Sequence, residues 1–518
     1  MKWGEFTSTS PSGHDKAVLK RMKTQDKLAH ETGQMPLYRQ FFEIKAILMD
    51  SSIKIGHVFE RWKKVINTLI EKIPGLPLLN KLRVIHLIES DFNLMIGILW
   101  GRRMIWEAEE KEIFHDGQSG SRPGRRAQEQ IIQKHSVLSI LRMSQQNGSS
   151  FDNDAKSCYD RIVMPLASLC SQQIGMPPSA CKLFLKTLES TKYHIKTSHG
   201  ISDRYYDTTN QTNIHGPGKG GRGSPAIWVA ISSIIMKCME EKTYGASIRS
   251  PFPNRPGTRF WLTGFVDDVT HWCINSQQQE QPELCHDLQF AAQWWEQLLH
   301  ASGGKLKLSK CFFYIIKWTF DPGGIPSLAP PETFKNQITI TDSETGNDVI
   351  IPHRSCEETH KTLGIMETPD GSNEAEYNRL LKLSNSHGQQ AATGRLTRHE
   401  ACIYYASTYI PSMSYSMVIG TLTEQQWEKI QCHSRQTFLA AMGYNRCSPT
   451  QIVYGPIDLG GFGLQNLFDR QETEKILFLL RLLQTNRAAS ETLKLQLEWV
   501  RNSHRSDADL DIQTDALF

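Results

Sequence analysis

Three aspartates at two places in the chain have the residue type and the setting of metal-binding acids. Asp267 and Asp268 are adjacent within RFWLTGFVDDVTHWCIN (259–275), where apolar, β-prone flanks predict a strand, a tight turn and a second strand. Asp154 ends another β-prone stretch and precedes a predicted helix over 161–173. Mg²⁺ prefers a few carboxylates together with phosphate oxygens and water. The three acids therefore predict a magnesium site, with turn residues and helix caps as the alternative interpretation.

One reaction that a set of Mg²⁺-binding acids can serve is nucleotide addition. A primer 3′-hydroxyl attacks an α-phosphate while pyrophosphate leaves, and two Mg²⁺ ions about 4 Å apart stabilise both oxygens. Asp154, Asp267 and Asp268 would supply carboxylates from two adjacent strands, and without a cation they would repel one another. We therefore expect two Mg²⁺ ions, with Mn²⁺ as the alternative ion.

A glycine-rich loop is the third element with chemical potential. HGPGKGGRGSPAIWVAISSIIMKCMEE begins at His215, and its Ser224-Pro225 pair suits the first turn of an apolar helix that runs to about Glu241. Glycines let the main chain approach a base or a phosphate closely, and Lys219 and Arg222 add positive charge. The order of residues is not that of a Walker loop.

A second loop with concentrated positive charge precedes a helix predicted over 127–143. Arg122, Arg125 and Arg126 lie in a Gly/Pro/Ser stretch, GQSGSRPGRRAQEQ. Guanidinium groups before a helix N-terminus predict a surface that contacts phosphates. A solvated turn is the alternative.

Length and composition are those of a globular protein with several lobes. The chain has 518 residues, of which 39% are hydrophobic and 22% charged, and residues 1–150 hold 23 Lys and Arg against 16 Asp and Glu. A basic front before an acid-bearing middle suits a polyanion held beside a cation site. No apolar run is long enough to span a membrane, and the eleven cysteines contain no CxxC pair. We expect an intracellular protein of the nucleus or cytoplasm.

Periodicity predicts the elements that must position these groups. Apolar residues recur at helical spacing across 37–72, which predicts two helices, and 82–88 reads as a strand. An amphipathic helix is predicted over 283–302, a hairpin insertion over 320–358, and helices over most of 374–500. Polar tails are expected at both ends.

Eight segments, in order, resemble the conserved motifs of reverse transcriptases of the non-LTR, LINE-like retrotransposon type, over about residues 60–480. Asp154, followed five residues later by Tyr159, resembles motif A; Gly216–Pro225 resembles motif B, and Phe265–Asp268 resembles motif C. The flanking matches are the fingers segments LRVIHLIESDFN and GQSGSRPGRRAQEQI, Leu308–Cys311 as motif D, His360–Ile365 as the motif E hairpin, and GPIDLGGFGLQNL after the thumb.

The resemblance implies an α+β right-hand polymerase with fingers, an RRM-like palm with an antiparallel sheet, and a helical thumb. The expected divisions are a tail over 1–35, fingers and N-terminal helices over 36–148, palm over 149–372, helical thumb and connection over 373–502, and an acidic tail over 503–518. The implied activity is RNA-directed DNA synthesis. The expected partners are an RNA template, a DNA primer, dNTPs and a separate endonuclease, without a membrane.

The resemblance also implies roles for individual residues. Asp154, Asp267 and Asp268 would hold the metal ions and, with Lys310 as a proton donor, form the catalytic set. The nucleotide would be bound by Arg83, Tyr159, Lys219, Gly220 and Ser224, and nucleic acid by Arg122, Arg125, Arg126 and Arg222. Tyr159 would exclude a 2′-hydroxyl. The family usually carries Gln where this chain has Lys219, and the alternative function is that of a catalytically inactive, nucleic-acid-binding relative.

Overall fold

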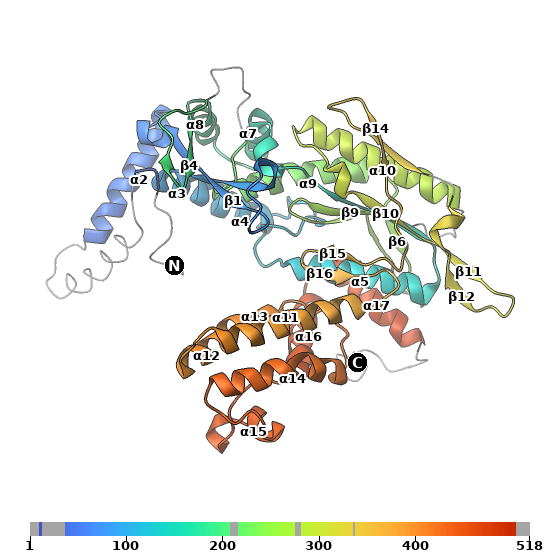
Figure 1. The fold of residues 1–518 in the computed structure, drawn as a ribbon. Coiled ribbons are helices and arrows are strands. Elements are labelled where there is room, and N and C mark those ends of the chain that lie inside the picture. The colour runs from blue at the N-terminus through green and yellow to red at the C-terminus, as the bar shows by residue number, and fades with distance from the viewer. Residues whose placement is uncertain (1–9, 13–36, 208–215, 275–280, 335–336, 504–518) are drawn as a thin grey trace.

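The computed structural model describes residues 10–12, 37–207, 216–274, 281–334 and 337–503. The protein mixes helices and strands in an N-terminal part, a central sheet with helices on both faces, and a C-terminal helical part (Figure 1). Within those ranges, no helix is both long and apolar enough to cross a membrane. The two predicted tails lie outside the described residues, apart from 10–12 and Ser503.

A four-stranded sheet and a group of helices make up the N-terminal part. The strand order is β2-β1-β4-β5, with β1 antiparallel to β2 and parallel to β4. Its strands are β1 (Lys64–Glu71), β2 (Leu82–Leu87), β4 (Lys192–Thr197) and β5 (Gly200–Ile201). The helices are α2 (Leu37–Ile55), α3 (Ser90–Ile98) and α4 (Ile105–Glu110), the last two joined by a π-helical turn at Leu99–Met104.

The prediction of two helices over 37–72 is half wrong. α2 confirms the first, but the second stretch forms a short 3-10 turn (Glu60–Lys63) and then strand β1. Three of the eight residues of β1, Val65, Ile66 and Ile70, are β-branched aliphatics, which lose side-chain freedom in a helix and pack well on a pleated surface. Helical spacing in a short apolar run does not distinguish the two structures.

The central sheet carries the predicted acids. Its order is β10-β3-β9-β8, and all neighbours are antiparallel. Its strands are β3 (Gly148–Asp154), β8 (Leu262–Phe265), β9 (Asp268–Cys273) and β10 (Phe312–Ile316). The predicted strand–turn–strand over 259–275 and the predicted strand before Asp154 are both confirmed. In the register of β3 and β9, Asp154 lies opposite Asp268.

Helices cover both faces of this sheet, and side chains alternate between them. Val269 and Cys273 of β9 belong to the large core that includes α9 and α10, whereas Trp272 packs with residues of α5. The helices are α5 (Ala127–Ser144), α6 (Cys158–Arg161), α7 (Met164–Gln173), α8 (Pro178–Glu189), α9 (Ser224–Lys242) and α10 (Gln281–Ala301). The helix predicted over 161–173 is therefore shorter than expected, because α6 ends at Arg161 and α7 begins anew at Met164 with a proline in its first turn.

A buried ion group joins α5 to this sheet. Lys134 Nζ lies 2.6 Å from Asp152 Oδ1 and 3.6 Å from Glu367 Oε2, with the lysine side chain 2% exposed. Thr270 of β9 donates to the same oxygen of Asp152 at 2.7 Å. Breaking a buried ion group costs several kcal/mol, about 3–5, because the remaining charge stays unpaired. The group therefore fixes α5, β3, β9 and the strand of Glu367 to one another.

Four short hairpins follow or flank the central strands. Their members are β6 (Ala246–Ile248) with β7 (Thr258–Phe260), β11 (Trp318–Phe320) with β12 (Pro326–Leu328), β13 (Ile338–Thr341) with β14 (Asp348–Ile351), and β15 (His360–Thr362) with β16 (Ile365–Glu367). The predicted hairpin over 320–358 is confirmed as the β13–β14 pair. The β15–β16 pair coincides with the segment that resembles motif E.

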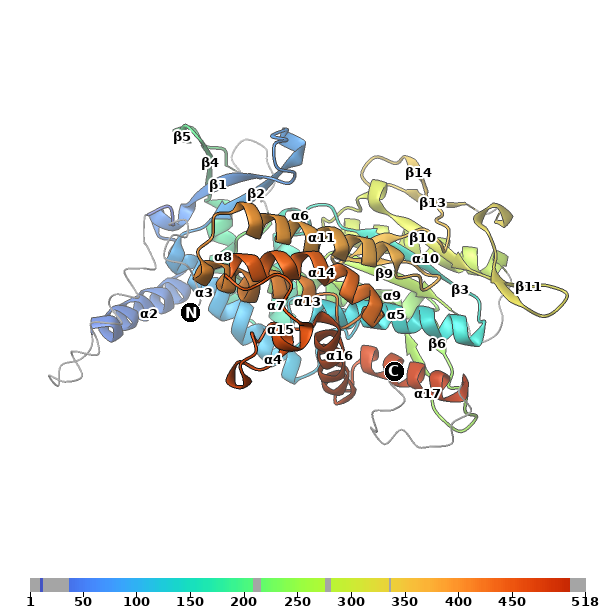
Figure 2. The ribbon, with the colours of Figure 1, turned by 60° about the horizontal axis from the view of Figure 1, so that its bottom comes forward.

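The C-terminal part is helical, as predicted. Its members are α11 (Glu374–Thr393), α12 (Arg398–Tyr404), α13 (Ile410–Ser414), α14 (Glu424–Ala441), α15 (Thr450–Tyr454), α16 (Leu467–Leu483) and α17 (Ala488–Ser503). Capping boxes at Thr397 and Thr423 begin α12 and α14. α11 and α14 run alongside each other (Figure 2). α17 returns to the sheet and packs on α5, where Ser136 Oγ donates to Gln496 Oε1 at 2.6 Å.

Candidate active site

The structure places two of the predicted acids opposite one another in the register of neighbouring strands. Asp154 and Asp268 are opposite one another on β3 and β9, and their side chains share the face of the sheet that α5 covers, because Asp152 and Thr270 two residues away meet Lys134 there. Opposite side chains have Cβ atoms about 5 Å apart. Asp267 occupies the turn next to them, and its main-chain oxygen accepts from Ala155 N at 3.3 Å.

The turn that presents these acids has a strained backbone. Val266 has a φ of +61°, which a β-branched residue rarely adopts. The side-chain amide of Gln118 holds the peptide groups of this residue from both sides: Val266 N donates to Gln118 Oε1 at 2.9 Å, and Gln118 Nε2 donates to Val266 O at 3.2 Å. Trp228 Nε1 donates to the same carbonyl at 2.6 Å. We call this arrangement the turn clamp.

Sequence analysis missed both side chains of the turn clamp. Gln118 is fully buried in the GQSGSRPGRRAQEQ segment, of which only the arginines are predicted as site residues. Trp228 lies in α9, the helix after the glycine loop. Gly120 allows the close approach, because a Cβ there would lie 2.3 Å from Val266 N. Neither residue type nor spacing in the sequence links Gln118 to Val266, 148 residues away. The sequence indicates only that a glutamine lies between two nearby glycines, Gly117 and Gly120.

Burial and mutual repulsion perturb the acids. Burial, with the negative charge of Asp154, raises the pKa of Asp267 above its usual range. Burial, with the charges of Asp267 and Asp154, raises the pKa of Asp268 to about 6. The carboxylates of Asp267 and Asp268 are thus held where ionisation costs free energy. A bound cation would remove that cost, so the acids fit a hard divalent ion in residue type and in electrostatics.

Lys310 supplies positive charge at this position. Its ammonium group forms an ion pair with Asp154 Oδ2, and Lys307 N donates to the main-chain oxygen of Asp154 at 2.9 Å. Burial lowers the pKa of Lys310, but the hydrogen bond to Asp154 and the nearby negative charges outweigh this effect and raise it. Among the residues that the structure describes, no group of three or more His, Cys, Asp or Glu side chains is arranged to hold a metal ion.

The described part of the glycine loop, residues 216–223, packs directly against the segment that resembles motif A. Gly216 N donates to Asp160 O at 3.2 Å, and a Cβ on Gly216 would lie 2.0 Å from the carbonyl oxygen of Tyr159. On the other side, His86 N donates to Lys219 O at 2.6 Å. Gly220 has a φ of +129° and faces the carbonyl of His86. The loop is therefore positioned between β2 and Tyr159.

Lys219 Nζ lies 3.7 Å from Asp160 Oδ2. Its charge is also felt at Asp267, whose raised pKa it partly lowers. The ammonium group of Lys219 is thus close to the acids. In contrast, Ser224 is buried, and its hydroxyl donates to Gly218 O at 2.8 Å, which is a contact within the loop. Arg222 N donates to Asn93 Oδ1 at 2.8 Å, which ties the loop to α3.

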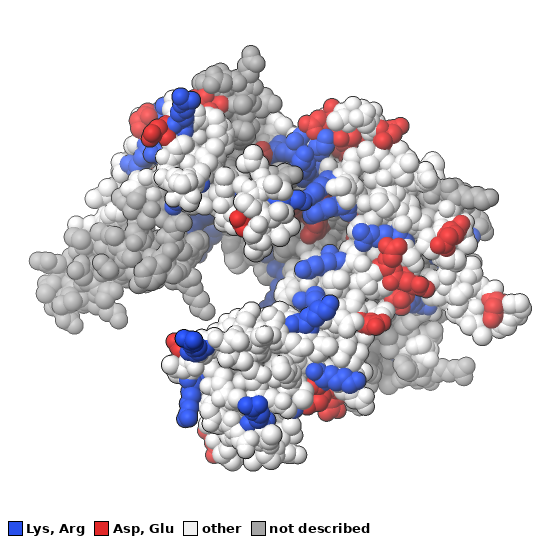
Figure 3. All heavy atoms as spheres, viewed as in Figure 1, with Lys and Arg blue, Asp and Glu red and all other residues white. Residues whose placement is uncertain are grey.

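Arg83 is exposed on β2 and belongs to a group of cations near the glycine loop. Burial lowers the pKa of Lys72, and the charges of four neighbours lower it further: Lys307, Lys219, Arg83 and Lys81. The charges of these four residues therefore act on Lys72 from nearby. The space-filling view shows Lys and Arg side chains gathered toward the middle of one face (Figure 3).

Two of the four predicted nucleic-acid-binding arginines are corrected to structural roles. Arg122 Nε donates to Glu109 Oε2 at 2.7 Å, and its Nη1 donates to the carbonyls of His115 and Gln118. Arg125 pairs with Asp116 Oδ1 at 2.6 Å. Their side chains are 2% and 7% exposed, so neither guanidinium faces an open surface. The loop folds inward because Glu109 and Asp116 compensate these charges. Arg126 is exposed at the start of α5.

Comparison with known proteins gives a distant result. No protein-family model matches the chain, and no curated protein matches it. Among solved structures, the chain is similar to one described as apo telomerase from Candida tropicalis truncated from the C-terminal domain, with 12% sequence identity and a TM-score of 0.33. The match covers 60% of this chain and 60% of that chain. A likeness of this extent carries no argument about function.

Replacing Gln118 by Leu is expected to destabilise the protein by about 2–3 kcal/mol, because the buried peptide groups of Val266 lose their amide partner. The midpoint of urea unfolding measures this. Gln389→Leu, an exposed position on α11, is the matched control and should shift the midpoint little. Equal shifts in the two variants would contradict the role of the turn clamp.

Asp268→Asn is expected to stabilise the protein at pH 7.5 in the presence of a chelator, by about 1–2 kcal/mol. The pKa of Asp268 is raised in the folded state to about 6, so its ionisation costs stability as the pH rises from about 4 through 6. The advantage of the variant should therefore shrink toward pH 4.5, as measured by urea unfolding at both pH values. Asp458→Asn, at an exposed position, is the control. An advantage that does not change with pH would refute the electrostatic origin.

Proposed function

We propose that the chain is an RNA-directed DNA polymerase that adds deoxynucleotides to a primer 3′-hydroxyl, with a right-hand layout of fingers (36–148), palm (149–372) and thumb (373–502). The observation that carries this proposal is the register that sets Asp154 opposite Asp268, with Asp267 in the adjoining turn. Two-strand presentation of three carboxylates suits a reaction that handles phosphates through divalent ions.

Asp154, Asp267 and Asp268 would hold two Mg²⁺ ions. When bound, the ions would supply positive charge that stabilises the transferring phosphate and the leaving pyrophosphate. The residues of the chain have further roles. Lys310, now paired with Asp154, would release that carboxylate, and its ammonium, which is protonated at neutral pH, would provide a proton to the pyrophosphate. The turn clamp keeps Asp267 and Asp268 in place during this exchange.

Tyr159 would select the sugar. Its main chain is in contact with the glycine loop, and its half-buried side chain packs against the large core. A ring fixed in this way next to the acids would meet a 2′-hydroxyl and admit only deoxynucleotides. Lys219 and Gly220, on the opposite loop, would approach the nucleotide or the template from the other side.

The cations near the glycine loop support binding of nucleic acid. Arg83 and its neighbours would contact the triphosphate and the phosphates of an RNA template paired with a DNA primer, so that binding would weaken steeply with salt. Arg126 and Arg222 would extend this contact along the backbone. A retroelement origin and a separate endonuclease partner belong to the same proposal.

A specific observation favours a second candidate, a catalytically inactive nucleic-acid-binding protein. In the described residues the acids do not form a metal-binding group, and lysines pair with Asp154 and Asp160. Such pairs would satisfy the acids in a protein that uses only its basic surface. Primer extension separates the two candidates, because the second binds primer–template and never extends it.

Asp267→Asn is expected to reduce primer extension by about 10³-fold or more, because one of the carboxylates that neutralise the reacting phosphates is lost. Extension of oligo(dT) on poly(rA) with Mg²⁺ and dTTP measures the activity, and a filter assay measures binding of the duplex, which should change little. Asp458→Asn is the control and should extend normally. Extension that survives in Asp267→Asn would refute the metal assignment, and binding without extension by the parent would establish the inactive candidate.

Tyr159→Ala is expected to raise incorporation of ribonucleotides relative to deoxynucleotides about ten-fold or more, because the ring no longer meets the 2′-hydroxyl. Tyr159→Phe should keep the discrimination of the parent, since the ring remains. Single-nucleotide extension with dTTP and UTP gives the ratio. Tyr244→Ala, 69% exposed, is the control. Unchanged discrimination in Tyr159→Ala would remove the gate role.

A further inference from the structure

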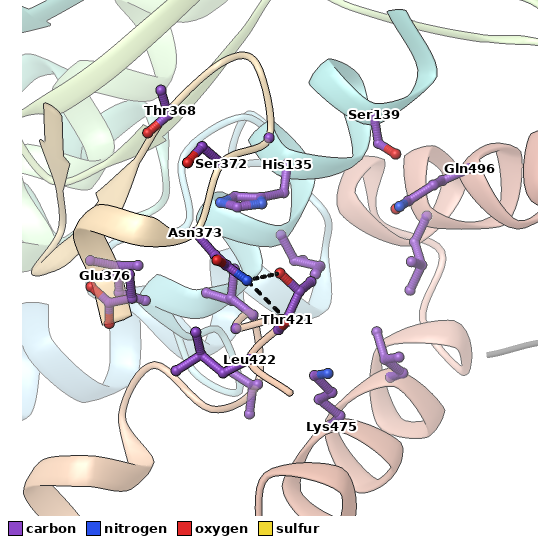
Figure 4. A pocket seen from close by; sticks show the side chains of 18 of the residues that line it. His135, Ser139, Thr368, Ser372, Asn373, Glu376, Thr421, Leu422, Lys475 and Gln496 are labelled. Atoms are coloured by element: carbon purple, nitrogen blue, oxygen red, sulfur yellow. Dashed lines mark hydrogen bonds between the residues drawn. The ribbon is translucent and has the colours of Figure 1, made fainter. Parts of the chain in front are cut away.

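A cavity lies where the central sheet and the C-terminal helices meet. Its volume is about 410 Å³, within the range of small-molecule sites. Residues of α5, of β16 and the segment after it, of the 418–422 connection before α14, and of α16 and α17 line it (Figure 4). We call it the junction cavity. Its walls come from both the sheet-bearing part and the helical part of the chain.

Aliphatic and polar side chains share the wall. The aliphatic ones come from distant parts of the sequence and include Ile132, Ile365, Val418, Ile419, Leu479 and Leu497. Apolar lining with a few polar groups is typical of sites that bury an organic ligand. The body of a fitting ligand would therefore be apolar.

Several acceptors among the polar lining groups are already occupied. The carboxylate of Glu376 accepts two hydrogen bonds from Arg379, at 2.7 and 2.6 Å, and a third from Met366 N at 3.0 Å. Gln496 Oε1 accepts from Ser136, and Thr421 O accepts from Asn373 at 3.1 Å. The negative charge that Glu376 contributes to the wall is therefore compensated within the protein.

Donors and positive charge remain available in the junction cavity. Lys475 reaches in from α16, with a contact of 3.3 Å to Glu472 Oε1 (Figure 4). Arg142 uses one nitrogen, Nη1, to donate to Pro369 O at 2.7 Å, which leaves other donors of its guanidinium. Gln496 presents its amide NH₂ group from α17. Donors beside an apolar wall select a ligand with an acceptor head, and cations select a negative one.

We propose that the junction cavity binds an amphipathic organic anion, with a carboxylate, phosphate or sulfonate head at Lys475 and an apolar body against the aliphatic wall. This inference goes beyond the proposed function, because it requires neither metal nor nucleic acid. An occupant would touch α5 and β16 on one side and α16 and the 418–422 connection on the other. It would thereby hold the helical part at a set distance from the sheet.

The test uses the full chain and the fluorescent probe 8-anilinonaphthalene-1-sulfonate, which joins a sulfonate to an apolar body. The probe should bind saturably. Decanoate and decyl phosphate should displace it. The ratio of their displacement constants shows whether the site prefers a carboxylate or a phosphate head. Decanol and decyltrimethylammonium should displace it at least about ten-fold less well. Equal displacement by the cationic and anionic competitors would overturn the choice of an anion.

Substitutions locate the site. Ile419→Trp fills the cavity and should weaken probe binding at least about ten-fold, whereas Ile350→Trp, on exposed β14, should leave it unchanged. Val418→Phe is the smaller filling variant if Ile419→Trp does not fold. Lys475→Gln should weaken decanoate binding about five-fold or more, while Lys494→Gln, a lysine with the same (i, i+3) pairing to a glutamate, should not. Parental affinity in either filling variant would overturn the proposal.

Discussion

Repulsion between like charges is the constraint on which the centre of this protein depends. Two aspartates directly opposite on neighbouring strands, with a third in the adjoining turn, are destabilising by themselves. The surrounding structure compensates: Lys310 pairs with Asp154, Lys219 lies within the electrostatic reach of Asp267, and the turn clamp fixes a backbone that would otherwise relax. Such a compensated arrangement of like charges is characteristic of a functional site, because folding alone does not require it.

The buried ion group extends this support away from the acids. Lys134 joins Asp152, two residues before Asp154, to Glu367 on the β15–β16 hairpin. Lys134 thus helps to position two elements. One is β3, the strand that carries Asp154, and the other is the β15–β16 hairpin, which precedes the C-terminal helices. Because the group is 2–9% exposed, its members interact in a low dielectric, where small displacements are costly.

Local patterns predicted the elements well and the side-chain partners poorly. The alternation around Asp267, the apolar run after Pro225 and the periodicity beyond residue 374 are local signals, and the structure confirms the strands and helices that they predict. The second helix over 37–72 failed because pairing with β2 decides between helix and strand, and the sequence does not show that pairing. Arg122 and Arg125 failed for a similar reason. Whether a loop arginine faces solvent depends on acids such as Glu109 and Asp116 that fold back to meet it.

The return of α17 to α5 has a mechanical consequence for the helices between residues 374 and 483. They contact the sheet-bearing part at several places: through the segment that follows β16, through Tyr415, whose hydroxyl donates to Leu363 O at 2.7 Å, and at α17, where Gln496 meets Ser136. Just before α17, Arg487 pairs with Glu129 at 2.8 Å. A shift of the helices relative to the sheet would break several of these contacts at once. Sliding along the sheet or lifting from it would require α17 to detach. The helical part is therefore attached to the sheet through tertiary contacts as well as through the chain connection, which restricts its motion relative to the sheet.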